Sequence, residues 1–85
     1  MNAAEIAGGI EAFIRATFDV SSTDINFNHE VDLFELGYVD SVGFAELIEF
    51  LQDRFSVTIP DSALLSDEFL SIRGMAGIIS RLADQ

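Results

Sequence analysis

Two neighbouring residues, Asp40 and Ser41, are the first candidates for chemistry, because they stand where a helical hydrophobic pattern begins. A serine in the first turn of a helix exposes its hydroxyl to solvent and to a modifying enzyme. A phosphodiester formed there would be stabilised by the amides and the dipole of the helix N-terminus. In the plainer structural interpretation, Ser41 merely follows an Asp N-cap, which is a common arrangement. Position alone favours this plainer interpretation.

Direct catalysis by Ser41 is poorly supported. A nucleophilic serine needs a base beside it, but the chain has no cysteine and its single histidine, His29, lies in a polar segment where a surface position is expected. Val39 also occupies the place of the first glycine in a Gly-x-Ser-x-Gly elbow. The carboxylates that follow Ser41 form a solvated stripe, with no sign of a pocket that would shift their pKa values. We therefore expect that the protein is not an enzyme.

The segment before Ser41 partly matches a calcium-binding loop. Five residues fit the first, third, fifth, ninth and twelfth positions of an EF-hand frame, namely Asp24, Asn26, Asn28, Asp32 and Glu35. His29 stands at the sixth position, where the sharp turn needs glycine. The expected flanking helices do not fit either, because one ends near Phe18 and the other is broken by Gly37. Calcium sensing is thus a minor alternative, and loose cation binding by the acidic surface stays open.

The composition is that of a small acidic protein with ample material for one core. Hydrophobic residues make up 49% of the 85 residues, and 15 acidic residues against 4 basic ones give a net charge of −11. Such apolar content favours one folded domain over disorder. The charge would repel nucleic acids and anionic membranes, and from the sequence we expect neither a membrane span nor a secretion signal. We therefore expect a cytoplasmic protein, whose acidity either keeps it soluble or recruits basic partners.

The hydrophobic periodicity predicts an all-α fold, a small four-helix bundle with three main helices and one short helix. A first helix over about residues 3–18 begins with the capping-box pair Asn2 and Glu5. Its apolar face consists of Ile6, Ile10, Phe13, Ile14 and Phe18.

A second helix follows Asp40, which is a good N-cap. Its inner face consists of Phe44, Leu47, Ile48, Leu51 and Phe55, and its opposite face carries Glu46, Glu49 and Asp53. Val42 projects near this acidic stripe and is expected to be exposed beside Ser41. Gly43 costs the helix about 1 kcal/mol relative to Ala, and close approach of a partner is the reason we expect for it.

The segment between these helices is long for a small helical domain, so we expect an ordered loop anchored in the core. The expected anchors are Ile25, Phe27, Val31, Leu33, Phe34 and Leu36, with a turn of helix around Leu33. After the second helix, Ile59 precedes a proline and is expected to turn inward on an extended linker. Ser66 is expected to cap a short helix over residues 67–70, and Ser71 to cap the last helix. The inner stripe of that last helix is Ile72, Met75, Ala76, Ile79 and Leu82.

Together these segments resemble the acyl carrier protein family, over nearly the whole chain. The resemblance is carried by Asp32-Leu33-Phe34-Glu35-Leu36-Gly37, Val39-Asp40-Ser41-Val42, Glu46-Leu47-Ile48-Glu49-Phe50-Leu51 with Phe55, and Val57-Thr58-Ile59-Pro60-Asp61. It implies that a phosphopantetheinyl transferase attaches 4′-phosphopantetheine from coenzyme A to Ser41. The terminal thiol of that arm would hold a cargo as a thioester, which fits a chain without cysteine. By matching position, the resemblance also implies a docking face for basic partner surfaces, made of Asp40, Val42, Glu46, Glu49 and Asp53.

Some residues depart from the fatty-acid type of this family. Tyr38 and Val39 separate Gly37 from Asp40, and Val42 stands where those carriers have Leu. In these features the chain is more similar to D-alanyl, aminoacyl and peptidyl carriers and to discrete carriers of specialised pathways.

The leading prediction is therefore a single carrier domain over residues 1–85, non-catalytic and monomeric. It would be loaded with an amino acid or other acyl group by an adenylating acyl or aminoacyl ligase or a synthase, and would serve a downstream acyltransferase. The N-terminal Met1 and the immediate helix cap predict a stand-alone protein. The alternative is an unmodified acidic helical module that binds a basic protein partner.

Overall fold

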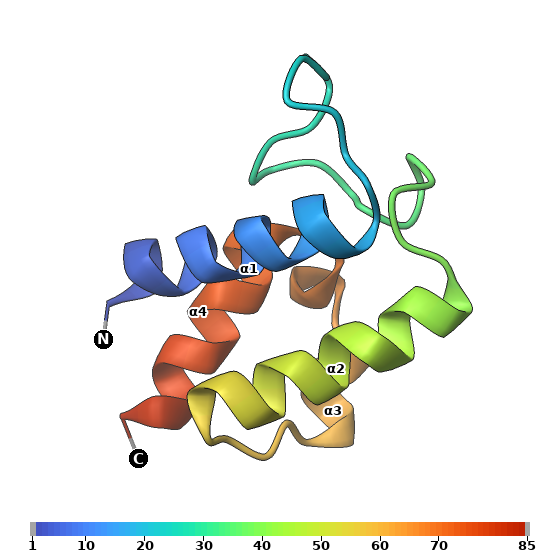
Figure 1. Cartoon of the computed structure of the whole chain (residues 1–85). Helices are drawn as coiled ribbons and strands as arrows, with labels where there is room; N and C mark the ends of the chain where they lie inside the picture. Colours follow the sequence, from blue (N-terminus) through green and yellow to red (C-terminus); the bar gives the residue numbers. More distant parts are fainter. Residues whose placement is uncertain (1, 85) are drawn as a thin grey trace.

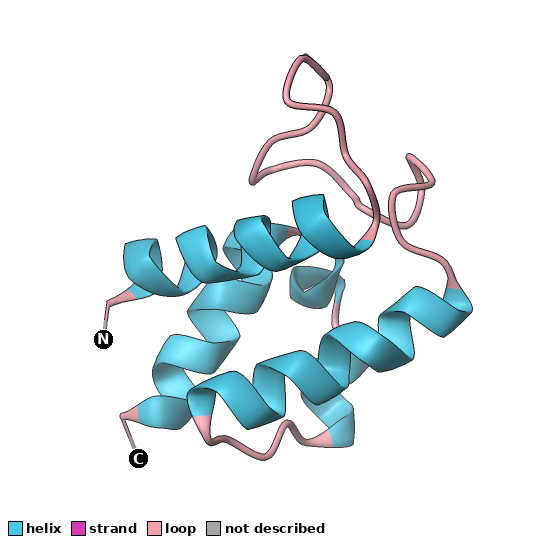
Figure 2. Cartoon of the chain, viewed as in Figure 1, coloured by secondary structure: helices cyan, strands magenta, loops and turns pink. Residues whose placement is uncertain are grey.

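The structure, a computed structural model, describes residues 2–84, and this range contains helices and loops but no strand (Figures 1 and 2). Met1, on which the stand-alone prediction partly rests, lies outside the described residues. In chain order the elements are α1 (Ala3–Thr17), α2 (Ser41–Phe55), α3 (Asp61–Leu64), the 3₁₀ helix η1 (Asp67–Leu70) and α4 (Ile72–Ala83). The predicted all-α bundle with three main helices, α1, α2 and α4, is confirmed.

The start of each main helix is fixed by the side-chain cap that the sequence predicts. Asn2 Oδ1 accepts a hydrogen bond from the Glu5 amide at 2.9 Å, and Ser71 Oγ accepts one from the Gly74 amide at 3.1 Å. The third cap, Asp40, is described with the site below. α1 ends at Thr17, one residue earlier than predicted, because Phe18 forms its C-cap.

The core lies mainly between α1 and α4, which pack against each other, and is completed by α2 (Figure 1). The predicted inner residues of α1 and α4 are buried, except that Phe13, Phe18 and Leu82 are only partly buried. In α2, Leu47 and Leu51 are fully buried and its three other predicted core residues partly so. Ile59 is also buried, as predicted, and its amide donates to Gln52 Oε1 at 3.0 Å. No helix within residues 2–84 is long and apolar enough to cross a membrane.

The segment between α2 and α4 differs from the prediction in two respects. Residues 61–64, for which no helix was predicted, form α3, whose N-cap is Pro60 with a φ of −71°. Ser66 does not cap the short helix over residues 67–70 with its side chain. Its hydroxyl instead donates to the Ala63 carbonyl at 2.7 Å and so closes the end of α3.

The long loop between α1 and α2 is ordered, and it rises above the C-terminal end of α1 in Figure 1. Of its predicted anchors, Leu33 and Phe27 are buried, whereas Val31 and Phe34 are partly buried. Two anchor predictions are wrong, since Ile25 is 92% exposed and Leu36 is 53% exposed.

Local turns explain both errors. Asp24 Oδ1 accepts from the Asn26 amide at 2.8 Å, and this tight turn carries Ile25 at its outer side. The predicted turn around Leu33 is present, with the Leu36 amide donating to the Asp32 carbonyl at 3.2 Å. This single turn buries Leu33 and leaves Leu36 on the solvent side.

Candidate functional site

Ser41 is the first residue of α2, and its N-cap Asp40 determines where that helix begins. Asp40 has an extended backbone (φ −104°, ψ −174°), and its Oδ1 accepts from the Gly43 amide at 2.8 Å. Ser41 is exposed, and none of the hydrogen bonds in the described part of the chain involves its hydroxyl. The arrangement leaves a free hydroxyl on a fixed helix start.

The segment that leads to Ser41 is held by backbone hydrogen bonds. The amides of Tyr38 and Val39 donate to the Leu33 carbonyl at 2.9 and 3.1 Å, and the Leu33 amide donates to the Leu70 carbonyl at 2.9 Å. Gly37 turns the chain with a φ of +83°, a conformation that glycine adopts without strain. Val39, which the sequence analysis did not assign to the core, is 2% exposed. The segment over residues 33–39 is therefore attached to η1 through Leu33 and to the core through Val39.

An apolar hollow of about 480 Å³ opens beside Ser41. Its lining residues are Phe34, Val39, Asp40, Ser41, Phe44, Leu64, Phe69 and Leu70. The ring of Phe44 packs against two other aromatic rings of this lining. Its centroid lies 5.2 Å from that of Phe34 and 5.8 Å from that of Phe69. Sequence reasoning missed this hollow because its walls come from the loop, α2, α3 and η1.

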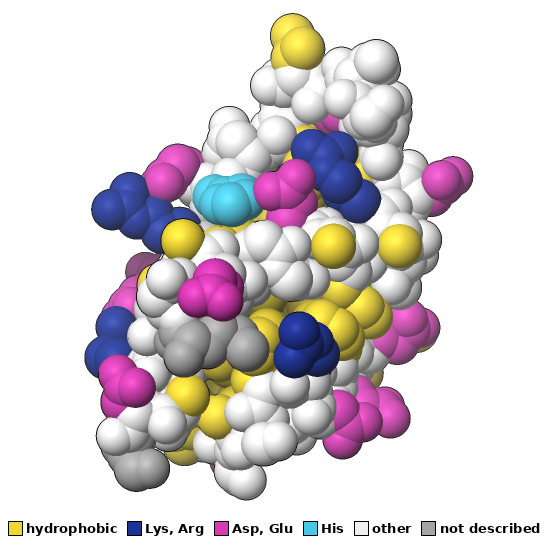
Figure 3. All heavy atoms as spheres, turned by 60° about the vertical axis from the view of Figure 1, so that its left-hand side comes forward, with side chains coloured by type: hydrophobic (Ala, Val, Ile, Leu, Met, Phe, Trp, Pro, Cys, Tyr) yellow, Lys and Arg dark blue, Asp and Glu magenta, His cyan; other side chains and the backbone are white. Residues whose placement is uncertain are grey.

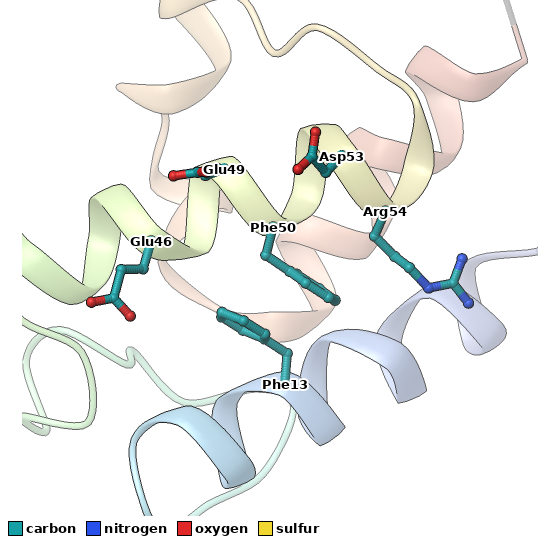
Figure 4. A pocket seen from close by; sticks show the side chains of 6 residues that line it. All are labelled: Phe13, Glu46, Glu49, Phe50, Asp53 and Arg54. Carbon is teal, nitrogen blue, oxygen red and sulfur yellow. The ribbon is translucent and has the colours of Figure 1, made fainter.

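The acidic stripe of α2 lies along a second hollow, a groove of about 520 Å³ between α1 and α2. Glu46, Glu49 and Asp53 are all exposed and line it, together with Phe13, Phe50 and Arg54. Figure 4 shows Phe13 reaching from α1 to Phe50 on α2, and their rings stack with centroids 4.0 Å apart.

The structure thus does not bring all five residues of the predicted docking face to one hollow. Three of them, Glu46, Glu49 and Asp53, share the groove, whereas Asp40 lines the hollow beside Ser41. Val42 lines neither and is 71% exposed, as expected from the sequence.

The structure gives a reason for Gly43 other than the predicted approach of a partner. Gly43 is buried, and a Cβ there would lie 2.6 Å from the ring of Phe18, at the end of α1. Sequence periodicity carries no information on this contact, because it joins two helices across the long loop.

Two polar residues of the calcium-like loop, Asn28 and Asp32, serve as turn caps. Asn28 Oδ1 accepts from the Glu30 and Val31 amides, and Asp32 Oδ1 accepts from the Phe34 and Glu35 amides. Within residues 2–84, no three His, Cys, Asp or Glu side chains gather in a way that could hold a metal ion.

Asp24, the first residue of that frame, caps a turn with one carboxylate oxygen and pairs with Tyr38 through the other. The Tyr38 hydroxyl donates to Asp24 Oδ2 at 2.9 Å. The pKa of Asp24 is lowered, mainly by the hydrogen bond from the Asn26 amide and then by that from Tyr38. The pKa of Tyr38 is raised, first by burial and then by the bond to Asp24.

His29 lies at the surface, as expected, but it is paired. Its Nε2 is 2.6 Å from Glu11 Oε1, and Arg15 Nε donates to Glu11 Oε2 at 2.9 Å. Figure 3 shows the histidine, in cyan, between acidic and basic side chains. The pKa of Glu11 is lowered, first by the hydrogen bond from Arg15 and then by that from His29. The contact of His29 with Glu11 joins the loop to α1, and no local sequence pattern indicates it, whereas Glu11 and Arg15 are four residues apart on one helix.

Comparison with known proteins yields one family match and two informative relatives. The family model described as "Phosphopantetheine attachment site" matches residues 9–79. A D-alanyl carrier protein of Streptococcus suis (strain 05ZYH33) is 35% identical over 52 residues, which cover 61% of this chain and 66% of the relative. A D-alanyl carrier protein of Bacillus velezensis (strain DSM 23117 / BGSC 10A6 / LMG 26770 / FZB42) is 36% identical over 42 residues, which cover 49% of this chain and 54% of the relative. The matches thus span less than two thirds of either relative. No solved structure matches the chain significantly.

Proposed function

Because this chain belongs to the phosphopantetheine attachment-site family, we propose that it is a carrier protein with its cofactor on Ser41. It would hold an amino acid or other acyl group there and present it to partner enzymes. The observation that carries the proposal is the exposed, unbonded hydroxyl of Ser41 at the first residue of α2.

The residues around Ser41 fit the 4′-phosphopantetheine group. Ser41 would be the point of attachment, and the apolar hollow next to it offers a wall along which the arm could lie. When attached, the group supplies the thiol that carries a cargo as a thioester, in a chain that has no cysteine. Asp40 would serve as the cap that keeps the helix start in place.

Partner enzymes would bind chiefly to the acidic face of α2. The carboxylates of Glu46, Glu49 and Asp53 are exposed on one groove, and such a surface attracts basic protein surfaces. Asp40 and Val42 would extend this face toward Ser41. The partners in this proposal are a phosphopantetheinyl transferase, an adenylating ligase or synthase and a downstream acyltransferase.

In this proposal the chain is a single, non-catalytic carrier domain that acts as a cytoplasmic monomer. The chemistry on the cargo would be performed by its partners. A small amino acid is the favoured cargo, since the two relatives described above are D-alanyl carrier proteins.

The test is the intact mass of the chain after incubation with coenzyme A and a broad-specificity phosphopantetheinyl transferase. We expect the wild-type chain to gain the mass of one phosphopantetheine and Ser41→Ala to gain none. Ser62→Ala is the matched control, because Ser62 is also an exposed serine near the start of a helix, and this variant should gain the same mass as the wild type.

An unchanged wild-type mass would contradict the proposal, as would an equal gain in Ser41→Ala. The first result would favour the alternative, an unmodified module that binds a basic partner through the acidic face of α2, whereas the second would place the cofactor on another residue.

A further inference from the structure

Gly43 lies in the first turn of α2, two residues after Ser41, and is buried. A Cβ atom at this position would lie 2.6 Å from Phe18 Cε1 and 3.0 Å from Phe18 Cζ. On another side it would lie 3.3 Å from Asp40 Oδ1. Because glycine has no side chain, the Phe18 ring can pack directly against the first turn of α2 at Gly43.

The Phe18 ring has support behind it. It packs against Phe13 in a T-shaped arrangement, with ring centroids 6.2 Å apart and an interplanar angle of 87°. Phe13 in turn stacks on Phe50 of α2 at 4.0 Å. Phe18 is also the C-cap of α1, and its amide donates to the Ile14 carbonyl at 2.9 Å. The ring is thus held from behind by a row of aromatic side chains that crosses from α1 to α2.

The opposite side of the contact is the N-cap of the site. The oxygen that would crowd a Cβ on residue 43 is the same Asp40 Oδ1 that accepts from the Gly43 amide at 2.8 Å. A side chain at position 43 would therefore push between the supported ring and the cap. Because Phe13 and Phe50 back the ring, we expect the added side chain to displace the first turn of α2, which carries Ser41.

We propose that Phe18 and Gly43 are a positioning pair that sets the orientation of Ser41 for modification. Neither residue touches the reacting atoms, and the effect of each acts through the first turn of α2. The proposal rests on the proposed function, because it concerns the serine that receives the cofactor.

The pair should affect the turnover of the modifying enzyme and not its affinity. Three of the five residues proposed for docking, Glu46, Glu49 and Asp53, lie further along α2, and only Asp40 and Val42 lie beside Ser41. A misplaced hydroxyl lowers the rate of the chemical step, whereas unchanged docking leaves KM in place.

The experiment measures kcat and KM of a phosphopantetheinyl transferase with the full-length apo chain as substrate. For Gly43→Ala we expect kcat to fall by about tenfold or more, with KM within about twofold of wild type. For Phe18→Leu, which leaves space behind the first turn, we expect a smaller fall. The double variant should regain a kcat within about threefold of wild type, because the added methyl fills the space that the ring vacated.

Gly8→Ala is the control, since a Cβ on Gly8 would meet no atom within 4 Å. It should leave kcat and KM unchanged. The proposal is overturned if Gly43→Ala keeps the wild-type kcat, or if the two substitutions lower kcat independently.

If Gly43→Ala does not fold, the comparison of Phe18→Leu with the double variant decides. The proposal requires the double variant to have the higher kcat, and an equal or lower kcat overturns it. Failure of the proposed function would be seen in the mass measurement and not in the comparison of variants. The wild-type chain would then gain no mass, or Ser41→Ala would gain the same mass.

Discussion

At the scale of single residues, the local bonding of Ser41 differs from that of several other serines. The hydroxyl of Ser21 bonds to Thr23, that of Ser66 donates to a carbonyl and that of Ser71 caps α4. The Ser41 hydroxyl, in contrast, has no hydrogen-bond partner in the described part of the chain, and the capping of α2 is done by its neighbour Asp40. This division of roles between Asp40 and Ser41 leaves Ser41 available to a modifying enzyme.

Glu11 provides a prediction on pH at the same scale. Its pKa is lowered, first by Arg15 and then by His29. A carboxyl whose pKa is lower in the folded chain adds stability above its unfolded pKa, and this contribution is lost as the pH falls through the folded pKa. Glu11→Gln should therefore lower the free energy of unfolding at about pH 7 and change it much less at about pH 3, as measured by urea titration.

Glu35→Gln is the control for this prediction. Glu35 is exposed outside the helices, and no ion pair of its side chain is present within residues 2–84. It should show little difference between the two pH values. Equal losses of stability for Glu11→Gln at both pH values would contradict the role assigned to the cluster.

At the scale of elements, the loop between α1 and α2 is expected to depend on a few buried side chains. Leu33 is fully buried, whereas Ile25 is 92% exposed. Leu33→Ala should therefore cost about 2–5 kcal/mol of stability, and Ile25→Ala should change it by no more than about 0.5 kcal/mol. Urea unfolding of the two variants measures both values. Similar effects of the two substitutions would show that the loop is not anchored in this way.

The main helices could be predicted because their signals are local. Asn2, Asp40 and Ser71 are capping residue types followed by periodic apolar positions, and all three cap the helices predicted for them. α3 was missed because its four residues are too few to show a helical period. Ile25 and Leu36 were misassigned because burial in a loop follows its turns and not a period in the sequence.

The site could be predicted only in part. The family and its cofactor, inferred from the motif around Ser41, are confirmed by the family match. Contacts between distant segments gave no signal, however. The Phe18 ring at Gly43 and the pairing of Glu11 with His29 both join α1 to residues beyond its end, so only the folded chain reveals them.

At the scale of the whole molecule, the net charge of −11 would steer basic partners toward the chain, and the face of α2 would decide where they bind. Reversing charge in Glu46→Lys/Glu49→Lys should raise the KM of the transferase by about tenfold or more at low salt. The difference from wild type should shrink as the ionic strength rises. Steady-state kinetics at several salt concentrations measure both effects.

A second double variant distinguishes the effect of the position of the reversed charges from the effect of the net charge. Glu5→Lys/Asp84→Lys changes the net charge by the same amount, but at exposed positions in the first turn of α1 and after the end of α4. It should raise KM only slightly. If both double variants raise KM equally, the acidic face of α2 is not a specific docking surface.

The most direct test of the central claim is to locate the modification on the chain. The wild-type protein is incubated with coenzyme A and a phosphopantetheinyl transferase, digested, and the modified peptide is fragmented in a mass spectrometer. We predict that every fragment containing Ser41 carries the mass of the phosphopantetheine arm and that no fragment lacking Ser41 does. An arm on any other residue, or no modified peptide at all, would contradict the account.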